Sequence, residues 1–453
     1  MTNQAFSAVG AGAGYRSTPK KAAVASLVGS ALEWYDFFLY GTAAALIIGP
    51  LFFPSSDSVT GTLEAFVTFA VGFAARPIGG LIFGHFGDRL GRKKMLVITL
   101  MMMGISTALI GALPTHAQAG VIAPILLVLV RIVQGMAVGG EWGGSVLLIA
   151  EHSPHRRGFF TSFSQVGIML GFVLSAGMFA LFNQLPHHAF MSWGWRVPFL
   201  VSILLTVGGL AIRMKIEETP EFKVLQAGGQ THRYPVVEAL RTQPKQIAIT
   251  IGARMAENGG SYIFLVFAIA YGKHVGMDAT TLLIAAIVGN LVEMATVVLW
   301  GSLSDTLGRR PIYLIGAIGV VVWAFPFFAL IQTGETLNLY IALLVALGVC
   351  HGAMIGSQPT MFAELFRKDV RYSGMAIGHE VAAVIAGGIA PLIATALLAK
   401  YDTYWPIAIY LAILGLITVT AVAVAPETLS ARRHGQQTDD DLAKTSQAVG
   451  IDS

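Results

Sequence analysis

Charged residues are scarce in this sequence. Asp, Glu, Lys and Arg make up 12% of the 453 residues, whereas hydrophobic residues make up 55%. Ordinary soluble domains carry roughly 25% charged residues, so this chain has too little polar surface to enclose a soluble core of its length. The composition therefore excludes an ordinary soluble protein and predicts an integral membrane protein.

Cysteine is nearly absent. The single cysteine, Cys350, lies within an apolar run, which excludes an intramolecular disulfide and a cysteine metal site. The sequence also lacks a metal-spaced His/Cys cluster, a nucleophile motif and a soluble catalytic domain, so we expect no enzyme activity, no metal and no cofactor. The stretch "GAGAG" from Gly10 lacks the Lys-Ser/Thr pair of a phosphate-binding loop.

The N-terminus lacks the apolar stretch of a secretory signal. "MTNQAFSAVGAGAGYRSTPKK" is polar and ends in Lys20 and Lys21 directly before the first apolar run, which predicts a cytoplasmic, uncleaved N-terminus. The net charge of +4 comes from small clusters at the ends of apolar runs rather than from one basic face. We therefore expect the lipid bilayer, and no nucleic acid, as a partner.

Apolar runs long enough to cross a bilayer, roughly 20 residues each, recur along the whole chain. Short charged or Gly/Pro-rich segments separate them, and most of the 29 Lys and Arg residues fall in every second segment, beginning with the N-terminal tail. This bias predicts that both termini are cytoplasmic. The twelve predicted spans are residues 22–52, 62–84, 95–113, 121–150, 159–183, 195–214, 246–273, 280–301, 311–331, 338–362, 373–399 and 404–425.

A long polar interruption divides these spans into two sets of six, and the two sets repeat. "GHFGDRLGRKKML" from Gly84 is matched by "GSLSDTLGRRPIYL" from Gly301, 217 positions later. Parallel repeats are a known plan of transporters. The predicted parts are an N-terminal tail (1–21), a six-helix bundle (22–214), a cytoplasmic linker (215–245), a second six-helix bundle (246–425) and a C-terminal tail (426–453).

Several motifs resemble one transporter family. The loop "GHFGDRLGRK" resembles the signature of the major facilitator superfamily, and Arg131-x-x-Gln134-Gly135 resembles its second motif. The stretches "EWYDFFLYG", "ARPIGGLIFGHFGDRLGRK", "GGEWGGSVLLIAEHSP" and "SWGWRVPF" narrow the resemblance to the metabolite:proton symporters, and most of all to their shikimate and organic-acid permeases. The resemblance covers residues 22–426.

This resemblance implies an all-α polytopic fold, with twelve transmembrane helices in two pseudo-symmetric six-helix bundles around a central cavity. It also implies a monomer in the bacterial inner membrane. Acidic and basic residues at the cytoplasmic helix ends are expected to gate the cavity, because a carboxylate there can cap a helix and pair with arginine. The predicted gating residues are Asp88, Arg89, Arg92, Asp305 and Arg309, together with the pairs Glu151 with Arg157 and Glu364 with Arg371.

Two carboxylates lie inside the first predicted span. Glu33 and Asp36 are roughly 18 Å and 22 Å from Lys21 along a helix, near the middle of the bilayer, and Tyr40 extends the same helical face. An ionisable group at this depth is costly unless it faces a cavity or a partner. We predict that the two acids exchange the coupling proton and that Tyr40 contacts substrate. The alternative is that one acid pairs permanently with an arginine and joins two helices.

Two polar stripes are predicted to bind substrate across the cavity. Arg131, Gln134 and Glu141 share a face of the fourth span, and Arg254, Glu257 and Asn258 share a face of the seventh. An arginine can bind a carboxylate through two parallel hydrogen bonds. The alternative for the first stripe is a structural salt bridge. Further predicted cavity residues are Arg76, Gln165, Glu293, His351, Gln358 and His379. The two histidines are expected either to bind substrate or the coupling proton, or only to make hydrogen bonds within the helix bundle.

Together these features predict secondary active uptake of a small organic acid anion, driven by a proton gradient through alternating access. The embedded arginines suit an anionic substrate, and protonation of a span-one acid compensates its charge. Three alternatives stay open: a proton-coupled carrier of a zwitterion of the proline/betaine type, a proton-driven drug exporter, and an uncoupled facilitator. The short polar C-terminal tail lacks apolar heptads, which disfavours the osmosensing betaine subgroup.

Overall fold

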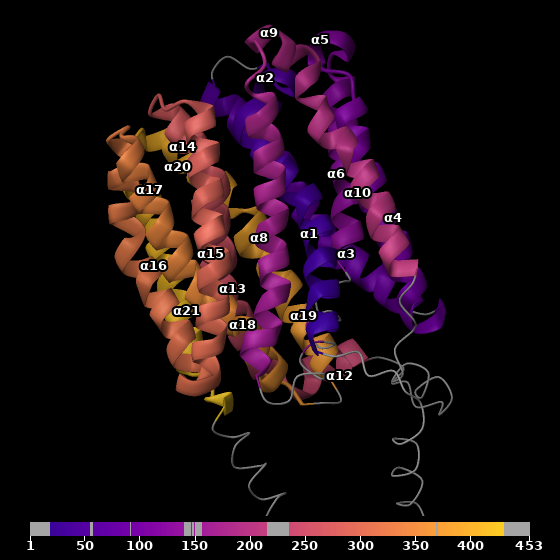
Figure 1. Ribbon diagram of the computed structural model, residues 1–453, viewed down its shortest axis with the longest axis vertical. Helices are drawn as coiled ribbons and strands as arrows, with labels where there is room; N and C mark the ends of the chain where they lie inside the picture. The colour runs from indigo at the N-terminus through magenta and orange to yellow at the C-terminus, as the bar shows by residue number, and fades with distance from the viewer. Residues whose placement is uncertain are drawn as a thin grey trace, which may run out of the picture.

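The computed structural model describes residues 19–54, 58–90, 92–139, 146, 149, 156–214, 235–367 and 370–429. These residues form helices and short connections, with no β-strand among them, and the long helices run side by side along the length of the molecule (Figure 1). Helices suit a lipid environment because each satisfies its own backbone hydrogen bonds.

The N-terminal half contributes six long helical segments. Short helices α5 (His116–Ala119), α9 (His187–Ala189) and η2 (Phe190–Gly194) connect them at one end of the molecule, at the top of Figure 1. The long segments are α1 (Pro19–Ala43) with the π-helical η1 (Ala44–Ile48) and α2 (Gly49–Phe52), then α3 (Ser58–Leu90), α4 (Arg92–Ala112), α6 (Ile122–Val138), α8 (Arg157–Phe182) and α10 (Arg196–Met214).

The C-terminal half repeats this plan after the short α12 (Pro235–Thr242). Its segments are α13 (Pro244–Tyr262) with η3 (Ile263–Phe267) and α14 (Ala268–His274), then α15 (Ala279–Leu307), α16 (Arg309–Gln332), α17 (Thr336–Val345) with η4 (Ala346–His351) and α18 (Gly352–Leu365), α19 (Arg371–Ala382) with η5 (Ala383–Gly388) and α20 (Ala390–Tyr401), and α21 (Trp405–Ala423). The π-helical segments η1 and η3 occupy equivalent places in the first segment of each half, so the repeat extends to this local detail.

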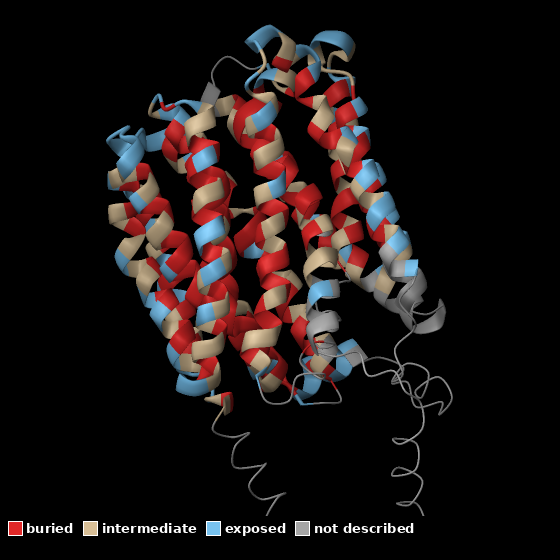
Figure 2. Ribbon diagram, in the orientation of Figure 1, coloured by how far each residue is buried: buried red, intermediate tan, exposed pale blue. Residues whose placement is uncertain are grey.

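Each of the twelve predicted spans overlaps one of these helical segments, and most of residues 140–150 of the fourth span lie outside the described part of the chain. By length and composition alone, seven helices among the described residues are apolar enough to cross a membrane, and the pair 187–194 and 196–211, bent by 42°, makes an eighth. Large apolar side chains such as Leu204, Leu299 and Val322 are exposed on the outer faces. Figure 2 shows the buried residues concentrated between the helices, as expected for a bundle whose outside faces lipid.

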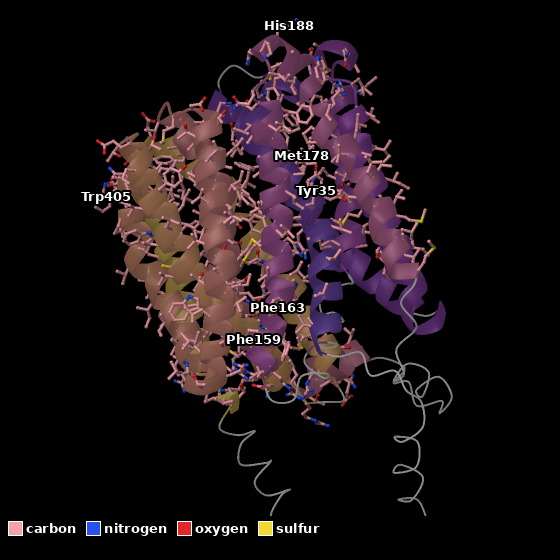
Figure 3. All side chains as sticks on the ribbon, in the orientation of Figure 1. Tyr35, Phe159, Phe163, Met178, His188 and Trp405 are labelled. Atoms are coloured by element: carbon pink, nitrogen blue, oxygen red, sulfur yellow. The ribbon has the colours of Figure 1, made fainter. Side chains whose placement is uncertain are left out.

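The two halves meet along two seams. In the first, α8 packs along α15, and in the second, α3 packs against η5 and α20. The chain enters α1 and leaves α21 at the same end of the molecule, at the bottom of Figure 1, which we call the terminal end. Side chains fill the space between the helices; Phe159 and Phe163 lie on α8 near the terminal end, and His188 lies at the opposite end (Figure 3).

Glycine allows α3 and α6 to cross at very short range. A Cβ atom added at Gly135 would lie 1.9 Å from the carbonyl oxygen of Gly72, and one at Gly139 would lie 1.9 Å from that of Arg76. Both obstacles are backbone atoms, which cannot move aside as a flexible side chain does. Small residues at such crossings let membrane helices approach closely.

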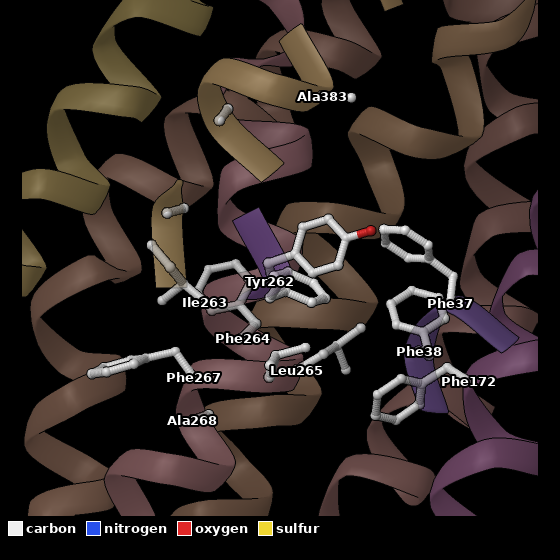
Figure 4. Packing of buried hydrophobic residues seen from close by; sticks show 14 of the residues in the cluster. Phe37, Phe38, Phe172, Tyr262, Ile263, Phe264, Leu265, Phe267, Ala268 and Ala383 are labelled. Carbon is white, nitrogen blue, oxygen red and sulfur yellow. The ribbon is translucent and has the colours of Figure 1, made fainter. Parts of the chain in front are cut away.

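Aromatic side chains fill the centre of the molecule where the halves meet. Tyr262 of α13 lies beside Phe37 and Phe38 of α1, with ring centroids 6.3 Å and 6.0 Å away (Figure 4). Phe73 of α3 completes the contact, with its centroid 5.3 Å from that of Tyr262. The edge-to-face packing of Tyr262 with Phe37 and Phe73 is favourable beyond the buried area, and Phe38 and Tyr262 also line the cavity described next.

Candidate functional site: a cavity between the two halves

A cavity of about 40 Å³ lies between the halves. Its N-terminal wall is mainly apolar and consists of Trp34 and Phe38 from α1 with Gln165, Ile168 and Met169 from α8. Its C-terminal wall carries the ionisable groups, which are Arg254, Glu257, Glu293, His351 and His379. Neutral polar residues of that wall are Asn258, Ser261, Asn290 and Gln358. One wall thus suits an apolar surface and the other suits charge and hydrogen bonds.

Glu293, His351 and Glu257 form a chain of ionisable groups along this wall. His351 Nδ1 makes a short hydrogen bond to Glu293 Oε1, and His351 Nε2 lies 3.8 Å from Glu257 Oε1. The histidine is the last residue of η4, and π-helical segments often occur at functional sites. Because both acids flank one imidazole inside the protein, the protonation states of the three groups depend on one another.

Arg254 stands next in the same chain. Its Nη2 lies 3.5 Å from Glu257 Oε2, one helical turn away, and its Nη1 donates a 3.0 Å hydrogen bond to Gln358 Oε1. Gln358 Nε2 in turn donates to the Tyr313 hydroxyl, and that hydroxyl donates to the carbonyl oxygen of Ala253. The guanidinium is therefore held in place at the cavity surface, where it can meet a carboxylate.

A second buried ion pair crosses the seam beside the cavity. Arg76 of α3 donates from Nε to Glu380 Oε2 at 2.9 Å and from Nη2 to Oε1 at 3.3 Å. His379 Nδ1 lies 2.9 Å from Glu380 Oε1. Arg76 and His379 were predicted from the sequence, whereas Glu380 was not, although an acid within an apolar run is itself the signal of a functional residue.

The polar residues of the fourth span lie behind the N-terminal wall. Arg131 donates to Gln134 in a short hydrogen bond and to the Phe69 carbonyl oxygen, and its guanidinium carbon lies 4.0 Å from the centre of the Tyr40 ring. Tyr40 makes a short hydrogen bond to Thr68. None of these side chains lines the cavity, and among the described residues Arg131 has no carboxylate partner. Their predicted contact with substrate stays a prediction.

Asp36 is buried but turned away from the cavity. It lies beside Thr107 of α4 and Ser202 of α10, and its Oδ1 has no hydrogen-bond partner among the described residues. The cavity-lining residues of α1, Trp34 and Phe38, are one turn apart. A residue midway between them points to the opposite side of a helix with 3.6 residues per turn, which explains why Asp36 faces the interior of the N-terminal bundle.

A network of acids and arginines joins the halves at the terminal end. Asp305 of α15 accepts hydrogen bonds of 3.0 Å from the backbone N–H groups of Gly158 and Phe159, the first turn of α8. Asp305 also pairs with Arg309 at 2.8 Å. A carboxylate at a helix N-terminus is favourable because the free N–H groups and the helix dipole attract negative charge.

Glu364 lies in the middle of this network. It lies 3.8 Å from Arg157 Nη1 across the seam and 3.5 Å from Arg309 Nε, and it accepts a 2.7 Å hydrogen bond from Thr428. Arg371 Nε donates to the Phe366 carbonyl oxygen. The predicted gating residues Asp305, Arg309, Glu364 and Arg157 are therefore brought together, and Arg157 reaches an acid of the other half. The pairing predicted for Arg157 was with Glu151, which lies outside the described residues.

Other predicted residues also fall outside the described part. The structure describes the backbone, but not the side chains, of Glu33 in α1 and of the predicted gating residues Asp88, Arg89 and Arg92 in α3 and α4. Glu141 lies outside the described residues altogether. Among the residues that the structure does describe, no group of three or more His, Cys, Asp or Glu side chains is placed to hold a metal ion.

The sequence matches transporter families over most of its length. Residues 21–248 match the family described as "Sugar (and other) transporter", and residues 249–447 match "Major Facilitator Superfamily". Among curated proteins, the chain is 42% identical to the shikimate transporter of Escherichia coli (strain K12) over 402 residues, 87% of this chain and 92% of that protein. It is 36% identical to the proline/betaine transporter of the same strain over 416 residues, 88% of this chain and 82% of that protein.

Solved structures show the same fold. The xylose transporter of E. coli, in a partially occluded inward-open conformation, matches with a TM-score of 0.69 at 19% identity, over 91% of this chain and 99% of that chain. A D-xylose-proton symporter matches with a TM-score of 0.67 at 20% identity, over 90% of this chain and 98% of that chain. The predicted fold class is thereby confirmed, and these relatives are transporters rather than enzymes.

Proposed function

Because this chain belongs to the major facilitator superfamily, we propose that it is a proton-coupled symporter that takes up a small organic acid anion by alternating access. The chain is a multi-pass membrane transporter; the proposal adds the substrate, the coupling ion and the direction. We place it in the cytoplasmic membrane of a bacterium with both termini cytoplasmic, working as a monomer and without a cofactor. Glu33 and Asp36 are the N-terminal candidates for the proton.

The division of the cavity into an apolar and a polar wall carries this proposal. A hydroxylated ring carboxylate such as shikimate has an apolar ring face, one carboxylate and several hydroxyl groups. Trp34 and Phe38 suit the ring face, Arg254 suits the carboxylate, and the amides suit the hydroxyl groups. The 42% identity to a shikimate transporter supports the same substrate class.

Alternating access is supported by contacts between the halves at both ends. At the terminal end Asp305 binds the first turn of α8, and at the opposite end Lys273 Nζ donates to the Leu46 carbonyl oxygen at 3.0 Å. Asn183 and Thr280 add a 2.9 Å hydrogen bond there. Because contacts join the halves at both ends, substrate enters the cavity only after one of these two ends opens.

A zwitterionic substrate of the proline/betaine type is the second candidate. Its carboxylate would use Arg254, while its cationic nitrogen would use Glu257 or Glu293 and the face of Trp34. The 36% identity to a proline/betaine transporter favours keeping this substrate in the test. The drug-exporter alternative is disfavoured because the cavity carries a fixed cation, Arg254, although Trp34, Phe38 and Tyr262 also line it.

Uptake of a labelled substrate panel into proteoliposomes tests the proposal. The panel contains shikimate, 2-oxoglutarate, citrate, proline and betaine, with and without an inward proton gradient. We expect the vesicles to accumulate a ring carboxylate such as shikimate. This accumulation should require the proton gradient and should be abolished by a protonophore. Accumulation of betaine or proline alone would establish the second candidate, and equilibration without any response to the gradient would contradict symport.

A further inference from the structure

The C-terminal wall holds two carboxyl groups on either side of one imidazole, all facing the cavity. We propose that Glu293, held by His351 and with Glu257 on the other side of that imidazole, takes up and releases the co-transported proton. This inference rests on the proposed symport and adds the site of the proton, which the sequence analysis placed on the first span. The contacts that carry it are the short Glu293–His351 hydrogen bond and the 3.8 Å approach of His351 to Glu257.

Three polar atoms of this cluster lack a hydrogen bond, although two of them lie within ion-pair distance of a charged neighbour. Glu293 Oε2, His351 Nε2 and Glu257 Oε2 are buried and make no hydrogen bond within the described residues. A buried polar atom without a hydrogen bond costs free energy. Since all three residues line the cavity, a proton, a water molecule or a substrate arriving there gains a partner at each of these atoms.

The charges around the cluster balance with one proton. Arg254 contributes one positive charge, Glu257 and Glu293 contribute two negative charges, and a proton shared by the Glu293–His351 pair brings the sum to zero. Neutral clusters are favoured where water is scarce. A substrate anion bound at Arg254 adds one negative charge, so the cluster then favours binding one further proton. Proton and anion binding therefore promote each other, which is the requirement for symport.

The described groups on the neighbouring elements fit this balance, and Tyr262 of α13, which also lines the cavity, adds no charge as a phenol. From α19, Glu380 is held by Arg76 of α3 in an ion pair that contributes no net charge, and His379 lies against that same acid. From α16, the Tyr313 hydroxyl is hydrogen-bonded through Gln358. From α15, α8 and α1 the neighbouring lining residues, Asn290, Gln165 and Trp34, are neutral.

The transfer itself is a single proton movement. With the anion at Arg254, a proton from water on the entry side forms an O–H bond at Glu293 Oε2. After the halves rock, the anion leaves first, and the excess positive charge then breaks that O–H bond and returns the proton to water on the exit side. His351 remains protonated throughout and holds Glu293 Oε1. The cycle moves one proton with each monovalent anion.

The experiment tests two cavity variants, Glu293→Gln and His351→Gln. Asp36→Asn tests the first-span alternative for the proton, and Glu238→Gln is the control, because it makes the same chemical change at an exposed carboxylate on α12. Each variant is reconstituted after size-exclusion chromatography has shown a monodisperse protein. Two readouts use labelled shikimate: exchange of internal for external substrate at equal pH, and accumulation under an imposed gradient. One proton per anion predicts about tenfold accumulation for a gradient of one pH unit, because each tenfold ratio corresponds to 1.4 kcal/mol.

We expect Glu293→Gln and His351→Gln to exchange substrate but to lose accumulation, with exchange in Glu293→Gln no longer dependent on pH. Glu238→Gln should behave as wild type. If wild type accumulates shikimate and both cavity variants still do so, the inference is overturned while the proposed symport stands. Loss of accumulation in Asp36→Asn alone would likewise overturn it. If wild type itself shows no gradient-driven accumulation with any substrate of the panel, the proposed function fails instead.

Discussion

Arg76 and Glu380 form a two-pronged ion pair that joins α3 of one half to α19 of the other, with Nε and Oε2 2.9 Å apart. The side chain of Arg76 is 2% exposed and that of Glu380 is 12% exposed. The pair lies beside the cavity, because His379, which contacts Glu380, lines it. In the proposed alternating-access cycle the two halves move apart, so this buried pair is a contact that the cycle would break and remake.

Reversing the charge of one partner of this pair should be far worse than exchanging the two. Arg76→Glu or Glu380→Arg alone leaves two like charges buried at the seam, and we expect transport to fall at least about tenfold, since breaking a buried pair costs about 3–5 kcal/mol. The double variant Arg76→Glu/Glu380→Arg should recover part of the uptake, measured as initial rates against amounts of protein in the membrane. Equal loss in the double and single variants would show that the pairing is not what matters.

The contact of Asp305 with the first turn of α8 should bias the carrier toward closure at the terminal end. Asp305→Asn keeps the size of the side chain but removes its charge and one hydrogen-bond acceptor. We expect the terminal end to open more often, by a factor of about 5 to 50 for 1–2.3 kcal/mol of lost differential contact. Distances between spin labels on α8 and α15 near that end measure this population.

A matched change at the opposite end should act in the reverse direction. Lys273→Met keeps an unbranched side chain that is one atom shorter and removes its hydrogen bond to the Leu46 carbonyl oxygen. Labels at the opposite end should then show more opening, and labels near the terminal end less. A shift in the same direction as Asp305→Asn would contradict the assignment of the two contacts to opposite gates.

Arg254 should decide affinity for the carboxylate. Arg254→Lys keeps the positive charge but loses the planar fork that binds a carboxylate with two hydrogen bonds. We expect KM for the organic acid to rise about tenfold or more with a smaller change in kcat, corresponding to 1.4 kcal/mol of binding. Arg156→Lys, an exposed change of the same kind, is the control, and an unchanged KM in Arg254→Lys would remove this residue from the binding site.

The crossing of α3 and α6 should not tolerate a side chain at Gly135. An added Cβ would lie 1.9 Å from the Gly72 carbonyl oxygen, so Gly135→Ala forces the helices apart. Overpacking of this kind costs about 1–3 kcal/mol or more. We expect a lower melting temperature in detergent and less protein in the membrane, whereas Gly208→Ala, where an added Cβ meets nothing within 4 Å, should be neutral.

The twelve helical segments could be predicted because apolar runs of bilayer length leave few alternatives to a helix. Their ends were less certain: α3 extends to Leu90, beyond the predicted residues 62–84, because the polar stretch "GHFGDRL" continues the helix. The π-helical segments were not predicted, since one extra residue in a helical turn leaves no mark on composition or periodicity. The sequence repeat of "GHFGDRLGRK" does not reveal that η1 and η3 occupy equivalent positions in the two halves.

The candidate site was predicted better in the C-terminal half than in the N-terminal half. Arg254, Glu257 and Asn258 do share a cavity-facing stripe, because i, i+3 and i+4 spacing fixes their common face. Asp36 was assigned to the cavity from its depth and from the helical face that it shares with Glu33 and Tyr40, and neither specifies which face of the helix meets the cavity. Trp34 and Phe38 escaped notice because aromatic side chains in an apolar run look the same whether they line a cavity or fill a core.

The most direct test of symport is to measure protons and substrate in the same vesicles. Wild-type proteoliposomes with an entrapped pH dye and no imposed gradient receive shikimate from outside, and the interior pH is followed while labelled uptake is counted. The account predicts acidification of the interior that follows substrate entry with one proton for each monovalent anion. Substrate entry with no change of interior pH would contradict proton-coupled symport and leave the chain an uncoupled carrier.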